Sequence, residues 1–123
     1  MNVSLWVLQA VLAAVFGLAG AMHATLPKEK LRPMLPWVED FTTTQVRLIG
    51  AVELLGALGL LLPAATGIAP ILTPLAATGL AITMLAAAVT HARRKEPAAV
   101  AVNVVLLALA ALIAWGRFGP YTF

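Results

Sequence analysis

Residues 46–62 read VRLIGAVELLGALGLLL, an apolar run with a single acid, Glu53, deep inside it. The run has 17 residues, and a helix needs about 17–25 apolar residues to cross the hydrocarbon core of a bilayer. Leu and Ala dominate it, and both favour helix. Because lipid offers no hydrogen bonds, backbone polar groups must be paired within their own segment. We therefore predict a transmembrane helix here.

Three more apolar windows, residues 3–22, 71–89 and 98–115, have similar lengths. None shows the period-two alternation of a membrane barrel. The first window lacks a basic flank and is longer than the apolar part of a signal peptide, about 7–15 residues, so we expect a retained span. The prediction is an all-α, polytopic membrane protein, a four-transmembrane-helix bundle forming a single domain over residues 1–123.

The composition agrees with a chain whose solvent is lipid. Hydrophobic residues make up 62% and charged residues 11%, against about 25% charged in soluble domains, and the mean hydropathy is +0.98. The bilayer is thus the first expected partner. The formal net charge of +3 resides in short loops, which is typical of membrane anchoring, so no nucleic-acid partner is predicted. The absence of cysteine excludes thiolate chemistry and cysteine-ligated metal centres.

The basic residues predict an orientation. Only Arg117 follows the last window, whereas seven basic residues lie in or beside the first and third loops: Lys28, Lys30, Arg32, Arg47, Arg93, Arg94 and Lys95. Lys and Arg concentrate in cytoplasmic loops. We predict a multi-pass protein of the cell membrane with both termini outside and the basic loops in the cytoplasm.

Turn and packing signals accompany the windows. One of the threonines at 42–44 can cap the second helix, residues 63–67 (PAATG) should end it, and Pro97 suits the first position of the last helix. Glycine and alanine recur along the first two windows, which favours close helix packing in lipid. We expect a compact bundle.

Polar residues converge on one depth of the bundle. Glu53 lies six residues beyond Arg47, and Asn103 lies six beyond Pro97, so each is about 9 Å inside the same edge at 1.5 Å per residue. The two side chains are therefore predicted to meet. His23 and His91 belong to the same end. The candidate ligand-binding residues are Glu53, Asn103, His91, His23 and Arg47.

Two interpretations of this cluster stay open. An intramembrane acid usually marks a proton relay or a ligand site, but the acid and the amide could instead form an interhelical hydrogen bond worth about 0.6–2 kcal/mol. Arg47 could simply extend to the headgroups. Two histidines and a carboxylate are metal-ligand types, but no HExxH-like spacing occurs, so no metal site is predicted. No nucleophile or phosphate loop is present, catalytic residues remain unknown, and we do not expect catalysis by this chain alone.

The stretch 47–63, with its Gly50-x-x-Glu53-x-x-Gly56 core, resembles the second span of DoxX-like proteins. The stretch LAATGL at 75–80, followed by Met84, His91 and Asn103, resembles their later spans. The resemblance implies a small four-helix membrane protein in which Glu53, His91 and Asn103 occupy characteristic polar positions. Some members of this family are linked to quinone-dependent thiosulfate oxidation together with another subunit.

The leading hypothesis is an accessory subunit that binds a lipophilic ligand, a quinone or a lipid, through the polar cluster. The alternative is an assembly factor or scaffold that docks a membrane-protein partner or a second copy of itself without catalysis. A transporter is less favoured, because four spans are few for alternating access unless the chain dimerises.

Overall fold

The computed structural model describes residues 2–122, which form four long helices and two short ones. The long helices are α1 (Asn2–Thr25), α3 (Thr43–Thr66), α4 (Leu72–Arg93) and α5 (Pro97–Phe118). The first loop contains α2 (Lys28–Leu31) and the 3-10 helix η1 (Pro36–Asp40). Each long helix is long and apolar enough to cross a membrane. The predicted four-helix membrane bundle is therefore confirmed.

The helices extend a few residues beyond most of the predicted apolar windows, because caps and turns rather than polarity end them. α3 begins with a capping box: the Thr42 hydroxyl accepts from the Gln45 amide at 3.1 Å, and the Gln45 side chain accepts from the Thr42 amide at 2.9 Å. It ends at Gly67, whose φ of 73° suits glycine. Pro97 opens α5, as predicted.

Pro63 lies inside the last turns of α3, so the helix runs on to Thr66 instead of stopping at the proline. A proline has no N–H and cannot donate to the carbonyl four residues earlier, which is that of Gly59. The Thr73 hydroxyl of α4 donates to this carbonyl at 2.9 Å instead. A side chain of a neighbouring helix thus replaces the lost backbone bond, as a bilayer requires.

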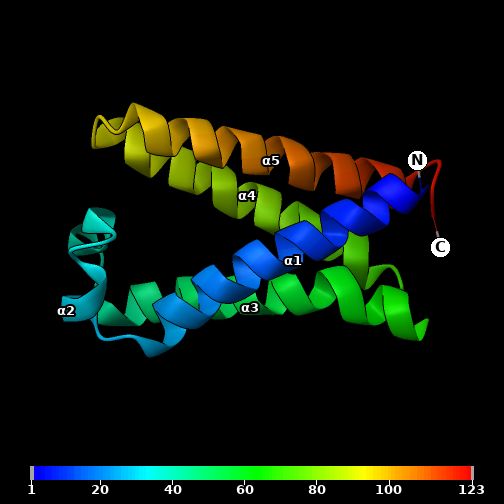
Figure 1. The fold of residues 1–123 in the computed structure, drawn as a ribbon, viewed down its shortest axis with the longest axis horizontal. Helices are drawn as coiled ribbons and strands as arrows, with labels where there is room; N and C mark the ends of the chain where they lie inside the picture. Colours follow the sequence, from blue (N-terminus) through cyan, green and yellow to red (C-terminus); the bar gives the residue numbers. More distant parts are fainter. Residues whose placement is uncertain (1, 123) are drawn as a thin grey trace.

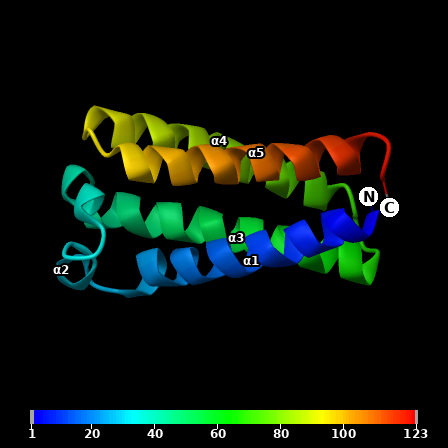
Figure 2. The ribbon, with the colours of Figure 1, turned by 45° about the horizontal axis from the view of Figure 1, so that its top comes forward.

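The four long helices form two pairs. α1 packs along α3, α4 packs along α5, and the pairs are joined by contacts between α3 and α4 (Figures 1 and 2). α1 and α5 have fewer contacts with each other. Both termini lie at one end of the bundle, and the short helices lie at the other (Figure 1).

Glycine allows the backbones of α1 and α3 to touch. A Cβ atom built on Gly50 would lie 2.5 Å from the Ala24 nitrogen and 2.7 Å from the Gly20 carbonyl oxygen. These are backbone atoms that no rotamer change can move, so only glycine fits at this crossing. The small-residue pattern of the first two windows therefore serves packing within the bundle.

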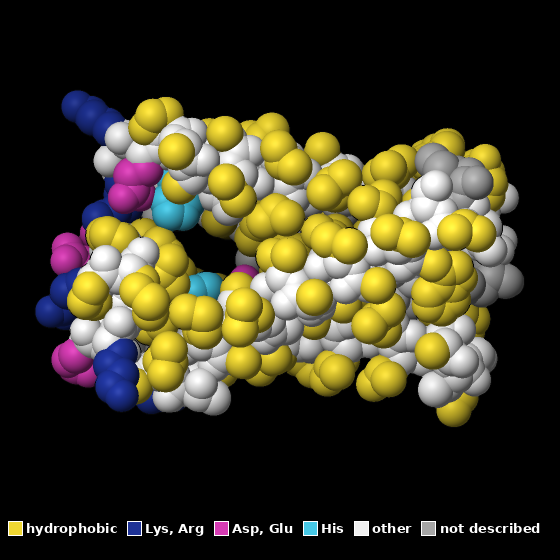
Figure 3. All heavy atoms as spheres, viewed as in Figure 1, with side chains coloured by type: hydrophobic (Ala, Val, Ile, Leu, Met, Phe, Trp, Pro, Cys, Tyr) yellow, Lys and Arg dark blue, Asp and Glu magenta, His cyan; other side chains and the backbone are white. Residues whose placement is uncertain are grey.

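Charged side chains gather at the end that carries the short helices, and apolar side chains cover most of the rest of the visible face (Figure 3). At the opposite end, no charged side chain is visible outside the grey region (Figure 3). This distribution gives the bundle two chemically different ends.

Candidate functional site

A cavity of about 460 Å³ lies between the two helix pairs at the charged end. Figure 3 shows its opening, with histidine side chains at the rim and a carboxylate inside. Most of its wall is apolar, and its polar side chains belong to a small set: His23, Glu53, Thr83, Thr90, His91 and Asn103. A mostly apolar pocket with a few convergent polar groups is typical of a small-molecule site.

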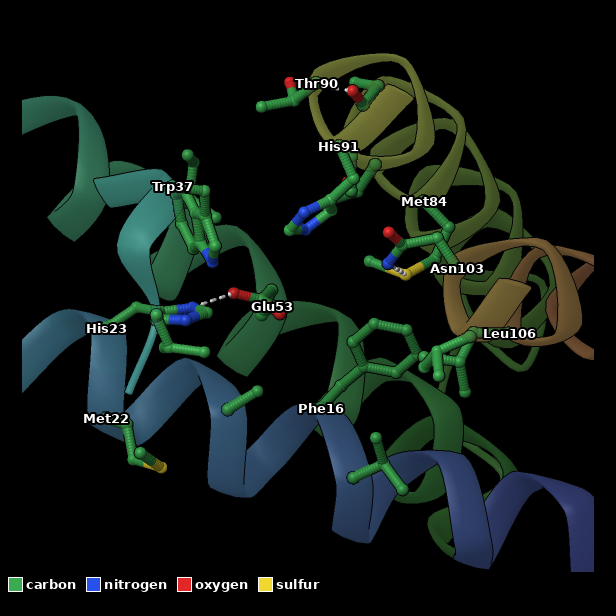
Figure 4. A pocket seen from close by; sticks show the side chains of 18 of the residues that line it. Phe16, Met22, His23, Trp37, Glu53, Met84, Thr90, His91, Asn103 and Leu106 are labelled. Carbon is green, nitrogen blue, oxygen red and sulfur yellow. Dashed lines mark hydrogen bonds and ion pairs between the residues drawn. The ribbon is translucent and has the colours of Figure 1, made fainter. Parts of the chain in front are cut away.

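His23 and Glu53 form a buried pair across the crossing of α1 and α3. The Nδ1 atom of His23 lies 2.6 Å from Oε1 of Glu53, and the two side chains are only 9% and 5% exposed. The close approach of the helices at Gly20 and Gly50 brings the two side chains within reach. The intramembrane acid therefore has an imidazole partner (Figure 4).

Trp37 of η1 stands between the two histidines (Figure 4). Its ring packs edge-on against His23 at 5.2 Å and against His91 at 6.5 Å between ring centroids. The Phe41 ring packs edge-on against the Trp37 ring, with 5.6 Å between the ring centroids. The first loop thus folds over the end of the cavity and supplies an aromatic wall. The sequence analysis did not identify this role of Trp37, because only the folded loop brings the ring over the bundle.

His91 is also paired with a carboxylate, but at the surface. Its Nδ1 atom lies 2.8 Å from Oε1 of Glu96, in the turn between α4 and α5. This hydrogen bond, assisted by the charge of Arg94, lowers the pKa of Glu96 below that of an ordinary glutamate. Arg94 also binds Asp40 at 2.9 Å. This contact raises the pKa of the arginine and ties the first loop to the end of α4.

The prediction that Glu53 and Asn103 meet directly is wrong in its geometry. Both line the same cavity, but the carboxylate pairs with His23, and the Asn103 amide nitrogen donates to the Met84 sulfur at 3.5 Å. The two residues line one cavity, but they belong to different helix pairs, Glu53 to α3 and Asn103 to α5. The Asn103 oxygen is buried, and no hydrogen-bond partner for it occurs in residues 2–122.

Arg47 does not line the cavity, in contrast to its place among the candidates. It is exposed, and its guanidinium donates to the Ala24 carbonyl at the end of α1, at 2.5 Å. That contact suits an arginine at a helix C-terminus, where carbonyl groups lack intrahelical partners. Four of the five candidates thus surround one cavity. Among the described residues no group of three or more metal-ligating side chains occurs.

The opposite end holds a second polar network that the sequence did not reveal. Arg117 of α5 is only 2% exposed, and its Nε donates to the Gln9 oxygen at 2.7 Å. Gln9 in turn donates to the Leu60 carbonyl of α3 at 2.7 Å. Further bonds reach Asn2 and the Tyr121 carbonyl. The network joins α1, α3 and α5.

Comparisons with known proteins agree with this architecture. The profile of the DoxX-like family matches residues 7–113, which include every residue of the cavity. No curated protein and no solved structure matches the chain. Since the match covers most of the sequence, the chain is an integral membrane protein that belongs to the DoxX-like family.

Proposed function

We propose that this protein binds a lipophilic molecule, such as a quinone or another ring-bearing lipid, in the cavity between the helix pairs, and serves a larger membrane system as an accessory subunit. The observation that carries the proposal is the cavity itself, an apolar space of about 460 Å³ with a polar cluster on its walls. Pockets that bury small ligands have volumes of about 300–1,000 Å³.

Access to the cavity is from the side. Val15 of α1 and Val102 of α5 both line it, yet they are 40% and 58% exposed on the outer face of the bundle. The opening then faces the acyl chains between α1 and α5, two helices that have few contacts with each other. A ligand dissolved in the bilayer can enter without crossing water, with its tail left among the lipids.

The cavity belongs to the cytoplasmic leaflet in this proposal. Seven of the eight basic residues of the chain lie at the cavity end or in its loops, and such residues favour the cytoplasmic side. Both termini then face outward. Cysteine substitutions at exposed loop positions, labelled by a membrane-impermeant maleimide in whole cells, test this orientation.

The scaffold alternative has less support from the packing. Rows of small residues on the surface would favour docking of a partner helix, but Gly20 and Gly50 face each other inside the bundle, and Gly56 and Gly59 are covered by α4. Gly79 alone among the glycines of the long helices has open space beside it. The small residues of the first two windows are thus largely used for packing within this chain.

The decisive experiment fills the cavity. Ala87 lines it, whereas Ala101 is exposed on α5 and does not line it. The variants Ala87→Phe and Ala101→Phe are purified in the same detergent, and bound small molecules are identified by native mass spectrometry together with any co-purified proteins. The proposal expects a ligand in the wild type and in Ala101→Phe but not in Ala87→Phe. Identical lipids in all three would contradict it, and a stoichiometric protein partner that survives cavity filling would favour the scaffold.

A further inference from the structure

We infer that the molecule held in this cavity carries a hydroxyl head group that donates a hydrogen bond, as a phenol or a hydroquinone does. The inference rests on the proposed function and narrows its ligand class. It follows from the hydrogen-bonding state of the cavity's polar side chains, most of which are left as acceptors.

Both imidazoles are oriented in the same way. Each Nδ1 atom is bonded to a carboxylate oxygen, His23 to Glu53 at 2.6 Å and His91 to Glu96 at 2.8 Å. Because an ionised carboxylate can only accept hydrogen bonds, we assign the hydrogen of each neutral ring to Nδ1, and this assignment makes Nε2 an acceptor. Neither Nε2 atom takes part in a hydrogen bond within the described chain.

Asn103 contributes a third acceptor. Its side chain is 9% exposed, its nitrogen donates to Met84, and its oxygen has no donor among residues 2–122. A buried carbonyl without a donor is unfavourable, and this one lies in the wall of the cavity of about 460 Å³. The Asn103 oxygen therefore lacks a hydrogen-bond donor, and the hydroxyl group of a ligand can supply one.

The two threonines of the wall add no donors. The hydroxyl hydrogens of Thr83 and Thr90 are committed to the carbonyls of Gly79 and Ala86 in their own helix, at 2.9 and 3.0 Å. Their oxygens remain as acceptors.

In contrast to these acceptors, Trp37 supplies a hydrogen-bond donor to the cavity. Its indole N–H is a donor without a partner in the described chain, and its nitrogen points toward Glu53 (Figure 4). A ligand hydroxyl can accept from this indole and donate to one of the acceptors, whereas a ligand carbonyl can only accept. The cavity is therefore matched to the reduced, hydroxylated form of a ring and less well to its carbonyl form.

The test compares two probes with the same carbon skeleton, tetramethylhydroquinone and tetramethylbenzoquinone. Binding to the purified full-length protein in detergent is measured by calorimetric titration without oxygen, at about pH 7.5, where imidazoles are ordinarily neutral. We expect the hydroquinone to bind about tenfold more tightly than the quinone. The preference should shrink to about twofold in Asn103→Leu and persist in Val104→Leu, a control at the neighbouring exposed position.

The results of this titration distinguish failure of the hydroxyl preference from failure of ligand binding itself. Equal binding of the two probes by the wild type, or tighter binding of the quinone, overturns the hydroxyl inference and leaves the ligand-binding function standing. Failure of both probes to bind at any attainable concentration overturns the ligand-binding function and the inference with it. The wild-type comparison needs no variant, so it is decisive even if Asn103→Leu does not fold.

Discussion

The two ends of this bundle both contain buried polar side chains, but these side chains differ in how they are hydrogen-bonded. At the end with the termini, Arg117 donates a hydrogen bond to Gln9, and Gln9 donates one to the Leu60 carbonyl. At the other end, His23 and Glu53 pair off on one wall, Asn103 stands on another, and about 460 Å³ of space separates the walls. A polar residue in a bilayer is costly wherever it lies; Arg117 and Gln9 are bonded to each other within the chain, whereas the Asn103 oxygen has no donor among residues 2–122.

This difference separates a structural role from a binding role. The cation–π contact of Arg117 with Trp6, at 5.6 Å, adds to a network of bonds between side chains of this chain itself. The oxygen of Asn103, by contrast, is buried beside a cavity without a donor in the described chain. We call the end around Arg117 and Gln9 the closed end and the end around His23, Glu53 and Asn103 the cavity end. We expect the closed end to determine stability and the cavity end to determine binding. The following predictions test this division, from the largest expected effect to the smallest.

Breaking the closed end should have the largest effect on stability. The variant Gln9→Leu removes the acceptor of a buried guanidinium and the donor to the Leu60 carbonyl. Hydrogen bonds to charged groups contribute about 1.5–3 kcal/mol, so a loss of this size is expected in the free energy of unfolding. Thermal unfolding in detergent measures it. Gln9→Glu, which keeps an acceptor for Arg117, serves as the control and should lose less; equal stability of Gln9→Leu and the wild type would refute a structural role for this network.

Breaking the His23–Glu53 pair should have an intermediate effect. The variant Glu53→Leu leaves His23 without its acceptor, which should cost about 0.5–1.5 kcal/mol, since the adjoining cavity can admit water or a ligand. Glu53→Gln retains an acceptor oxygen for the Nδ1 hydrogen and should be closer to the wild type. The same unfolding assay compares them. A larger loss than that of Gln9→Leu would reverse the proposed division of roles between the two ends.

Removing the unpartnered amide should leave stability almost unchanged. The variant Asn103→Leu loses one weak contact with the Met84 sulfur and removes a buried oxygen that has no donor in the described chain. We expect a change within about 0.5 kcal/mol in either direction, together with altered ligand preference. A strong destabilisation would show that the amide is a structural element of the kind found at the closed end.

Acidification should have the smallest effect. The pKa of Glu96 is lowered in the folded protein, first by the hydrogen bond from His91. A carboxylate of this kind contributes stability above its ordinary pKa and loses it as the pH falls through the lowered folded value. The unfolding temperature should therefore decline slightly in that acidic range. The decline should be weaker in Glu96→Gln; an identical pH profile of this variant would show that the turn contributes nothing.

Much of the fold could be predicted because its causes are local. The length of each apolar run predicts a span, and the Thr42 cap, Gly67 and Pro97 define helix ends through their own backbone and side-chain preferences. Helical rise predicted that Glu53 and Asn103 reach similar depths, and both line one cavity. The depth of a side chain, however, does not tell which neighbouring helix the side chain faces.

The sequence by itself determined four spans, their ends and the grouping of polar residues at one end. Only the tertiary structure decided that Glu53 pairs with His23, that Trp37 closes the cavity and that Arg117 is buried against Gln9. The physical reason is rotation about the helix axis. In a soluble protein a polar face shows which side of a helix points outward, but here lipid and core are both apolar, so each helix's direction toward its neighbours is set by packing alone.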